Sequence, residues 1–352
     1  MRLWILLIVA LLIFSCKKDK PFGPQYLEEV VFEVDINATH VLIINEGNFT
    51  FSNASITDYE IETATTRQTA FKQANENALG DVAQSLLIAG KTGYLFVNNS
   101  NEVIKVSMPS LKAQTRASVQ SPRYGLITSK GELWLTSLNK KDIFVLDTTN
   151  LKITKTLEAS NWLEELVETD NHVFACNVNE NTIDVYSLEG DRVKSIAVGK
   201  QPQSIVIDSY GMLWVLCDGG FNPRDREKAR LLRIDPISFA VTFYYEFEDI
   251  EHSPTRLNYN VTNQRLYFIN RAVYSFPVDL SEIAPTTTPS EIFKQEGANF
   301  YGLGIDAQSG NVIVTDAKDY SKKGIAYVLS SSGQLLYDFE TGVIPQDVAV
   351  YQ

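Results

Sequence analysis

Asparagine, arginine and aromatic residues recur at the ends of short apolar segments along this 352-residue chain. Asparagine offers hydrogen-bond donors and an acceptor, arginine adds charged donors, and tyrosine and phenylalanine offer flat apolar surface. Gathered together, such side chains suit the binding of a large, polar, neutral ligand. Asparagine is also a common turn residue, so for any single one a structural role is the simpler interpretation. The candidate ligand-binding residues are Asn45, Asn48, Phe49, Asn98, Asn99, Arg123, Tyr124, Asn139, Asn177, Asn179, Arg256, Arg271, Tyr301 and Gln346.

Signals of catalysis are weak in this sequence. It contains no HExxH helix motif, no Gly-rich phosphate loop and no GxSxG elbow. The histidines His40, His172 and His252 do not lie at metal-ligand spacing, and His172 is expected on the solvated surface. Acidic pairs such as Glu164-Glu165 are expected to be solvated edges. We therefore predict no enzymatic activity, no metal and no other cofactor.

The net charge argues against one class of partner, and the cysteine count argues against a disulfide framework. The net charge is −12, and the basic runs do not exceed Lys17-Lys18 and Lys140-Lys141, which argues against nucleic-acid binding. Three cysteines do not make a disulfide framework. Cys176 and Cys217 lie in apolar segments and are predicted to be buried free thiols that act as small hydrophobic residues.

The segments that must position the candidate residues form a repeat of about 40 residues. Similar stretches begin at Ser121, Asn161 and Gln201, and each holds an apolar run, a turn, and a second apolar run with an aromatic residue. This period is typical of β-propeller blades with four antiparallel strands each. The second apolar run of each unit carries one bulky residue, and seven can be followed: Ile43, Phe96, Trp134, Phe174, Trp214, Tyr267 and Ile313.

The two ends of the repeat complement each other. Residues 344–350 repeat the opening strand at 201–207, whereas the first unit, from His40, lacks an opening strand. We predict an all-β, seven-bladed propeller whose C-terminal strand completes the first blade and closes the ring. Residues 161–164 could instead form a helix capping box, but the repeat register favours a strand. The candidate residues would then share one face, where residues 219–229 form either a lid or a long charged connection.

The first 28 residues resemble an export and anchoring segment. Arg2 precedes an apolar run from Leu3 to Phe14, which suits a signal peptide over residues 1–15. Ser15-Cys16 then resembles a lipobox, which predicts lipidation at Cys16, a tether over 16–28 and the propeller over 29–352. A soluble secreted protein with an incidental cysteine is the alternative.

Three segments, Asn45–Phe49, Leu79–Ser85 and Asn98–Asn101, together with the blade repeat and the lipobox, carry a family resemblance. The chain resembles the YncE-like seven-bladed β-propeller surface lipoproteins of Bacteroidota. That family includes the BtuG-like lipoproteins, which capture vitamin B12 and pass it to a TonB-dependent transporter. The resemblance implies a lipid-anchored protein of the outer membrane, on the cell surface or on the periplasmic side.

The leading hypothesis is therefore a non-enzymatic protein that captures a nutrient, most specifically a corrinoid, on one propeller face. The rival is a surface module that uses the same face to bind a protein or a glycan and has no small-molecule ligand, since fold alone does not decide between them. An enzyme of the quinoprotein or lyase type ranks third because no cofactor constellation supports it.

Overall fold

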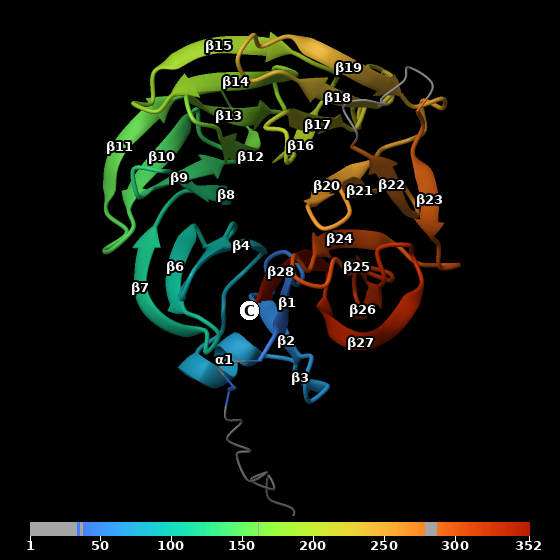
Figure 1. Cartoon of the computed structure of the whole chain (residues 1–352). Helices are drawn as coiled ribbons and strands as arrows, with labels where there is room; N and C mark the ends of the chain where they lie inside the picture. The colour runs from blue at the N-terminus through green and yellow to red at the C-terminus, as the bar shows by residue number, and fades with distance from the viewer. Residues whose placement is uncertain (1–33, 36–37, 161, 279–286) are drawn as a thin grey trace, which may run out of the picture. The chain divides into compact units, whose positions relative to one another are not determined.

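The computed structural model describes residues 34–35, 38–160, 162–278 and 287–352. The chain divides into two compact units, Met1–Val34 and Asp35–Gln352. The predicted signal peptide, Cys16, the tether and the predicted start of the propeller at residue 29 lie outside the described residues. The second unit is a seven-bladed β-propeller of four-stranded antiparallel sheets (Figure 1), which confirms the predicted fold class.

The blades follow one another in chain order, and the strands of each blade are named from the innermost to the outermost. Blade one contains β28 (Pro345–Tyr351), β1 (His40–Asn45), β2 (Ser55–Glu60) and β3 (Thr65–Arg67). Blade two contains β4 (Ala83–Ala89), β5 (Thr92–Val97), β6 (Glu102–Ser107) and β7 (Lys112–Ser118). Blade three contains β8 (Pro122–Ile127), β9 (Glu132–Ser137), β10 (Asp142–Asp147) and β11 (Ile153–Glu158). Blade four contains β12 (Leu163–Glu168), β13 (His172–Asn177), β14 (Thr182–Ser187) and β15 (Arg192–Ala197).

The last three blades repeat this order. Blade five contains β16 (Pro202–Ile207), β17 (Leu213–Cys217), β18 (Arg230–Ile234) and β19 (Val241–Glu246). Blade six contains β20 (Thr255–Asn260), β21 (Arg265–Ile269), β22 (Val273–Pro277) and β23 (Ser290–Phe293). Blade seven contains β24 (Phe300–Ile305), β25 (Val312–Asp316), β26 (Lys323–Leu329) and β27 (Leu335–Val343). The strand β12 confirms the strand prediction over the helix alternative.

Blade one closes the ring as predicted. Strand β28 pairs antiparallel with β1, from His40 opposite Tyr351 to Asn45 opposite Pro345. The neighbouring strand β24 approaches β28 so closely that a Cβ atom added at Gly304 would lie 2.7 Å from the Cβ atom of Val348. Glycine at this position therefore allows the last innermost strand to fit between its neighbours.

The hydrophobic core lies between adjacent blades and not on the propeller axis. The seven bulky residues predicted from the repeat are each at most 1% exposed: Ile43, Phe96, Trp134, Phe174, Trp214, Tyr267 and Ile313. Trp134, for example, packs with Leu163 and Leu166 of the next blade, and its ring meets the Tyr186 ring edge-on at 6.3 Å. Inter-blade packing therefore buries the bulky residue of every repeat.

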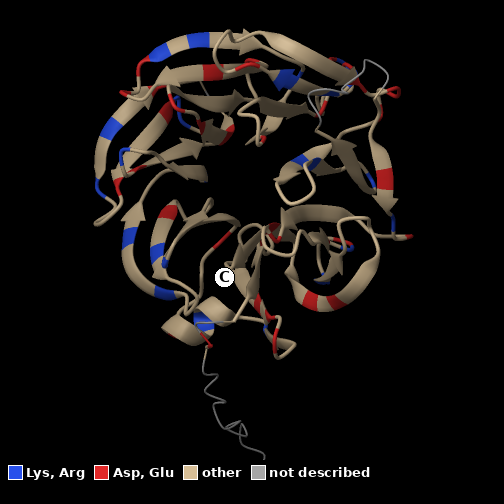
Figure 2. Cartoon of the chain, in the orientation of Figure 1, with Lys and Arg blue, Asp and Glu red and all other residues tan. Residues whose placement is uncertain are grey.

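A short helix, α1 (Ala70–Asn75), connects β3 to β4 and buries Ala70 and Phe71 against the first two blades. No helix in the described part of the chain has the length and apolar character that crossing a bilayer requires. Among the outermost strands, β7 and β15 carry Lys and Arg, whereas β19, β23 and β27 carry Asp or Glu (Figure 2), so basic residues do not extend around the whole ring.

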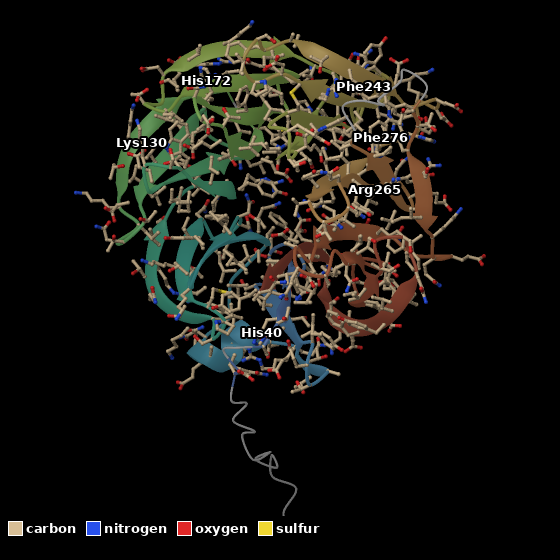
Figure 3. All side chains as sticks on the ribbon, viewed as in Figure 1. His40, Lys130, His172, Phe243, Arg265 and Phe276 are labelled. Carbon is tan, nitrogen blue, oxygen red and sulfur yellow. The ribbon has the colours of Figure 1, made fainter. Side chains whose placement is uncertain are left out.

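His40, His172, Cys176 and Cys217 lie within the blades. His40 and His172 lie in blades one and four (Figure 3). The prediction that His172 is a solvated surface residue is wrong, because its ring is half-buried and packs edge-on against Phe239 at 5.2 Å. Cys176 and Cys217 are buried free thiols in one hydrophobic cluster between blades four and five, as predicted.

Candidate functional site

Two sets of loops share one end of the ring, which we call the loop face. They are the connections between the second and third strands of each blade and the segments that lead into each innermost strand. Both sets fall at the same end because neighbouring strands of every blade run in opposite directions. The predicted binding residues all belong to these loops or to the strand ends beside them.

Each innermost strand begins with an irregularity in its pairing with the second strand. The register shifts in all seven blades, for example between Pro122 and Gly125 and between Leu163 and Leu166. A bulge of this kind re-aims side chains that a regular strand would point to alternate faces. The second residues of the seven innermost strands form what we call the axial ring: Gln84, Arg123, Glu164, Gln203, Arg256, Tyr301 and Gln346.

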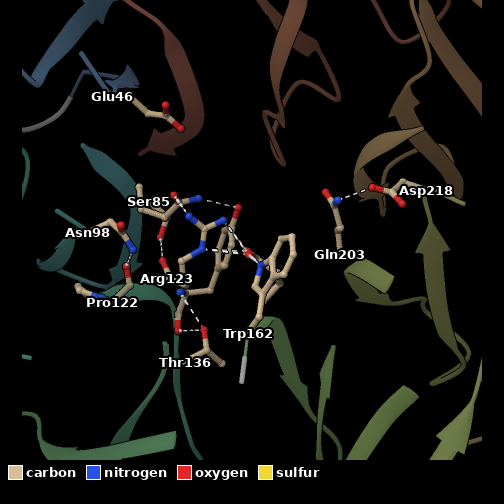
Figure 4. A network of polar contacts seen from close by, with 12 residues as sticks. Glu46, Ser85, Asn98, Pro122, Arg123, Thr136, Trp162, Gln203 and Asp218 are labelled. Atoms are coloured by element: carbon tan, nitrogen blue, oxygen red, sulfur yellow. Dashed lines mark hydrogen bonds and ion pairs between the residues drawn. The ribbon is translucent and has the colours of Figure 1, made fainter. Parts of the chain in front are cut away.

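Arg123 and Glu164 form an ion pair on one side of the axial ring (Figure 4). Arg123 donates to Glu164 from two nitrogens, with Nη2–Oε1 at 2.7 Å and Nε–Oε1 at 3.0 Å. The Glu164 side chain is 5% exposed and that of Arg123 is 18% exposed. Nη1 of Arg123 also donates to Gln84, and the Trp162 indole donates to Glu164. The prediction that Glu164-Glu165 forms a solvated edge is therefore wrong.

A chain of hydrogen bonds continues around the axis. The Tyr124 hydroxyl accepts bonds from Gln84 Nε2 at 3.2 Å and from Arg256 Nη1 at 2.7 Å. Arg256 also donates from Nε to the Tyr301 carbonyl at 3.1 Å, and the Tyr301 hydroxyl donates to Glu46 at 3.4 Å. Burial raises the pKa of Tyr124 to about 12 and raises the pKa of Glu46 above its usual range. These groups are held in place by one another.

A cavity of about 250 Å³ lies beside the axial ring. Most of the innermost-strand residues in its wall follow an axial-ring residue by one to three positions along the chain. Glu165, Arg256 and Asp347 contribute charged groups to its wall, and Tyr124 contributes its ring. Burial raises the pKa of Glu165 to about 8 and raises that of Asp347 as well. Apolar side chains fill most of the rest of the wall: Leu86, Leu87, Phe96, Val206, Leu257, Leu303 and Val348.

Large apolar side chains stand exposed on the loop face around this polar axis. Phe49 is 67% exposed, Phe51 73% and Phe221 68%. The Phe221 ring lies 6.1 Å from Trp162, which itself bonds to Glu164. Tyr320, 44% exposed, meets Tyr301 edge-on at 5.6 Å. The face therefore combines an outer set of aromatic side chains with a polar, pre-bonded centre.

A known family covers most of the chain. Residues 40–341 match the family described as "Domain of unknown function (DUF5074)". The chain belongs to the DUF5074 family. No curated protein matches this DUF5074 chain.

Solved structures resemble the DUF5074 propeller at low sequence identity. A protein from Lactobacillus plantarum is 14% identical, with a TM-score of 0.68 over 90% of this chain and 100% of that one. A quinoprotein alcohol dehydrogenase-like protein from Bacteroides thetaiotaomicron is 15% identical, with a TM-score of 0.66 over 88% of this chain and 77% of that one. The periplasmic gluconolactonase of Pseudomonas aeruginosa is 12% identical, with a TM-score of 0.66 over 90% of this chain and 99% of that one.

These likenesses establish the fold, which this DUF5074 protein shares with lactonase-like and quinoprotein-like propellers. Gluconolactonases are enzymes, but identities of 12–15% support no specific activity here. The described residues contain no group of three or more His, Cys, Asp or Glu side chains that could hold a metal ion.

Five of the predicted residues meet at the axis of this DUF5074 propeller: Arg123, Tyr124, Arg256, Tyr301 and Gln346. Gln346 is 2% exposed, and its Oε1 atom has no hydrogen-bond partner among the described residues. The repeat register could also have identified Gln84 and Glu164, because both occupy the same strand position as Arg123. Glu46, Glu165 and Asp347 were missed because nothing in their local sequence distinguishes them from surface carboxylates.

Three predicted asparagines are committed to internal structure. Asn45 is buried and donates to the Ile43 carbonyl and to Thr57 Oγ1, at 3.2 and 3.1 Å. Asn98 donates to the Pro122 carbonyl at 3.1 Å, and Asn177 donates to Asp184 at 2.8 Å. Their amides hold blade ends together and are not free for a ligand.

The other predicted residues lie on the periphery of the loop face. Phe49, Asn99, Asn139, Asn179 and Arg271 are exposed there, and Asn48 is half-buried. Asn48 donates to the Tyr320 carbonyl at 2.9 Å, and Arg271 donates to the Glu251 carbonyl at 3.2 Å.

The 219–229 segment is held at the junction of blades four and five. Lys200 forms an ion pair with Asp225, and its backbone N–H donates to Glu227 at 2.7 Å. A shallow pocket of about 190 Å³ lies between this segment and Trp162 and Asn179. The segment thus contributes Phe221 to the loop face from a fixed position.

Proposed function

We propose that this protein is a non-enzymatic binding protein that holds a corrinoid on its loop face. The exposed aromatic side chains carry the proposal, because aromatic rings beside a polar centre can cover an apolar ligand body while the polar groups bond its edge. Phe49, Phe51 and Phe221 are each at least 67% exposed. A corrinoid presents a flat apolar macrocycle, which such rings can cover, and several amides around its edge.

The polar groups of the face fit a large neutral ligand. Asn139 and Asn179 are exposed on the face and can exchange hydrogen bonds with ligand amides. The charges of Arg123 and Glu164 already neutralise each other. A pre-bonded scaffold spends little free energy on ordering itself when the ligand binds, so tight binding is attainable.

Calorimetric titration with cyanocobalamin tests the proposal. We expect binding at micromolar protein concentration, which corresponds to about −8 kcal/mol. Phe49→Ala combined with Phe221→Ala should weaken it at least tenfold. Tyr244→Ala is the matched control, because this residue is 63% exposed but lies on the outer strand of blade five. Absence of heat with the unaltered protein, or equal losses in both variants, would refute corrinoid binding at this face.

The delivery step is part of the same proposal. A protein lipidated at Cys16 would remain at the outer membrane and could pass its ligand to a TonB-dependent transporter. Metabolic labelling with palmitate should mark the unaltered protein and not Cys16→Ser. Recovery of a transporter from cross-linked outer membranes would support delivery, whereas an unlabelled protein released from cells would contradict the anchor.

A surface module for protein or glycan binding is the second candidate, since the same exposed aromatic residues also suit a macromolecular interface. The two candidates differ in the cyanocobalamin titration. If cyanocobalamin does not bind, but the Phe49→Ala/Phe221→Ala variant loses a cross-linked surface partner, the second candidate is favoured.

A further inference from the structure

Three ionisable side chains face the axial cavity without an ion partner. Glu165, Arg256 and Asp347 all contribute to its wall. None of them forms an ion pair within 4.0 Å with any described residue, although Arg123 and Glu164 directly above them do. The three groups are therefore close enough to share one cavity and too far apart to neutralise one another by contact.

The existing bonds of these side chains use neutral partners. Glu165 accepts a hydrogen bond from the Ile205 N–H at 3.0 Å, and Asp347 accepts one from the Leu86 N–H at 3.0 Å. Arg256 donates to the Tyr124 hydroxyl and to a backbone carbonyl. Each group thus has a fixed position and retains unused bonding capacity. Half-buried groups that lack a counter-charge are costly to ionise, so a ligand that supplies both signs would be stabilised there.

The volume and the remaining wall limit what that ligand can be. An apolar cavity of about 150 Å³ is enough to hold benzene. A cavity of about 250 Å³ can therefore hold a molecule somewhat larger, of the size of a small amino acid. Leucine and valine side chains line much of its surface, which suits an aliphatic body between the charged ends.

We propose that this cavity binds a small zwitterion, an α-amino acid with an aliphatic side chain. Its carboxylate pairs with Arg256, and its ammonium group lies against Glu165 and Asp347. Its side chain packs on the apolar wall that Leu257, Leu303 and Val348 contribute. The site is separate from the exposed aromatic residues of the loop face, so this inference goes beyond the corrinoid proposal and does not depend on it.

Proton release is an expected consequence of binding. Burial raises the pKa of Glu165 to about 8, so this carboxyl is largely protonated at pH 7 in the empty cavity. An adjacent ammonium group favours the ionised form and expels the proton. The other charged or titratable groups on this wall are Tyr124, Arg256 and Asp347, with Arg123, Glu164 and Glu46 above them. Affinity should rise as pH increases from 6 towards 8.

Calorimetry with three matched probes tests the inference. The protein is first unfolded, dialysed and refolded to remove any bound amino acid. Leucine should bind at one equivalent, while 3-methylbutylamine, which lacks the carboxylate, and 4-methylpentanoate, which lacks the ammonium group, should bind at least tenfold more weakly. Titration in buffers of different ionisation enthalpy should show release of up to one proton.

Two variants complete the test. Glu165→Gln keeps the shape of the side chain and should weaken leucine binding at least tenfold and abolish proton release. Glu102→Gln, on blade two, is the control and should change neither. No saturable heat with leucine, equal affinity for the amine, or unchanged binding in Glu165→Gln would each overturn the inference. The Phe49→Ala/Phe221→Ala variant should bind leucine normally, so failure of the corrinoid proposal is distinguishable from failure of this one.

Discussion

The Arg123–Glu164 pair yields the sharpest stability prediction. Glu164→Gln removes the negative charge that neutralises Arg123, while the amide can still accept one hydrogen bond. Breaking a buried pair in this way costs about 3–5 kcal/mol because one charge is left without a partner. Since Arg123 is 18% exposed and keeps its bond to Gln84, we expect a loss of about 3 kcal/mol in the free energy of unfolding.

Removing both charges should cost much less. Arg123→Met combined with Glu164→Leu eliminates the desolvation penalty of both groups and leaves apolar side chains of similar length. We expect this double variant to lie within about 1 kcal/mol of the unaltered protein. The pair Arg116–Glu102 is the internal control, because its side chains are 37% and 25% exposed. Glu102→Gln should therefore cost no more than about 1 kcal/mol.

Equilibrium unfolding in guanidinium chloride, followed by circular dichroism and tryptophan emission, measures all three variants. Trp162 bonds directly to Glu164, so its emission reports the same site. The reasoning is refuted if Glu164→Gln and Glu102→Gln lose equal stability. That result would mean that water screens Arg123 as effectively at the axis as it screens a side chain on an outer blade edge.

Three further predictions concern pH and ring closure. The pKa of Glu165 is raised from 4.5 to about 8, so between these pH values the folded state retains a proton that the unfolded state has lost. The free energy of unfolding should therefore fall by up to about 1.4 kcal/mol for each pH unit in this interval. Glu165→Gln should flatten that slope in urea titrations; an unchanged slope would contradict the assignment. Burial alone would lower the pKa of His40, but its hydrogen bonds to Asp58 and to the Asp35 carbonyl raise it above 6.5. The stabilisation from protonated His40 is complete below pH 6.5 and is lost as pH rises through the raised pKa. His40→Gln should therefore reduce the melting temperature more at pH 5.5 than at pH 8.5. An effect that does not depend on pH would count against the raised pKa. Deleting residues 345–352 removes β28 and exposes the edge of β1, so we expect aggregation on gel filtration and rapid proteolysis. A monomer with an unchanged melting temperature would disprove the role of β28 in closing the ring.

The repeat could be predicted from sequence because the same packing problem recurs in each blade. Trp134, Phe174 and Trp214 occupy the same inter-blade position, so their 40-residue spacing reports the fold directly. The match between residues 344–350 and 201–207 likewise located the strand that closes blade one.

The axial chemistry was harder to predict because it depends on neighbours from distant blades. An acidic pair in one strand is usually solvated, and only Arg123, about 40 residues away, makes Glu164 part of a buried pair. Glu165 and Asp347 reach one cavity from blades four and one. The local sequence around each residue does not indicate that their side chains line the same cavity.

The asparagines show the opposite difficulty. Asn45, Asn98 and Asn177 each tie the loop-face end of their own blade to backbone or side chains nearby. A residue repeated for structural reasons resembles, in sequence, a residue repeated to bind a ligand. Only the hydrogen-bond partners separate the two.

The bulge at the start of every innermost strand has a consequence for how such proteins diversify. It lets two successive residues of an innermost strand reach the axis, as Tyr124 does after Arg123 and Glu165 does after Glu164, while the strand ladder beyond it stays regular. Side chains at these positions bond from one blade to the next, as Arg123 does to Glu164, so an exchange on one blade calls for a matching exchange on its neighbour. Matched substitutions around a single opening can thus change the axial chemistry while the scaffold stays, and solved propellers with 12–15% identity to this chain retain that scaffold.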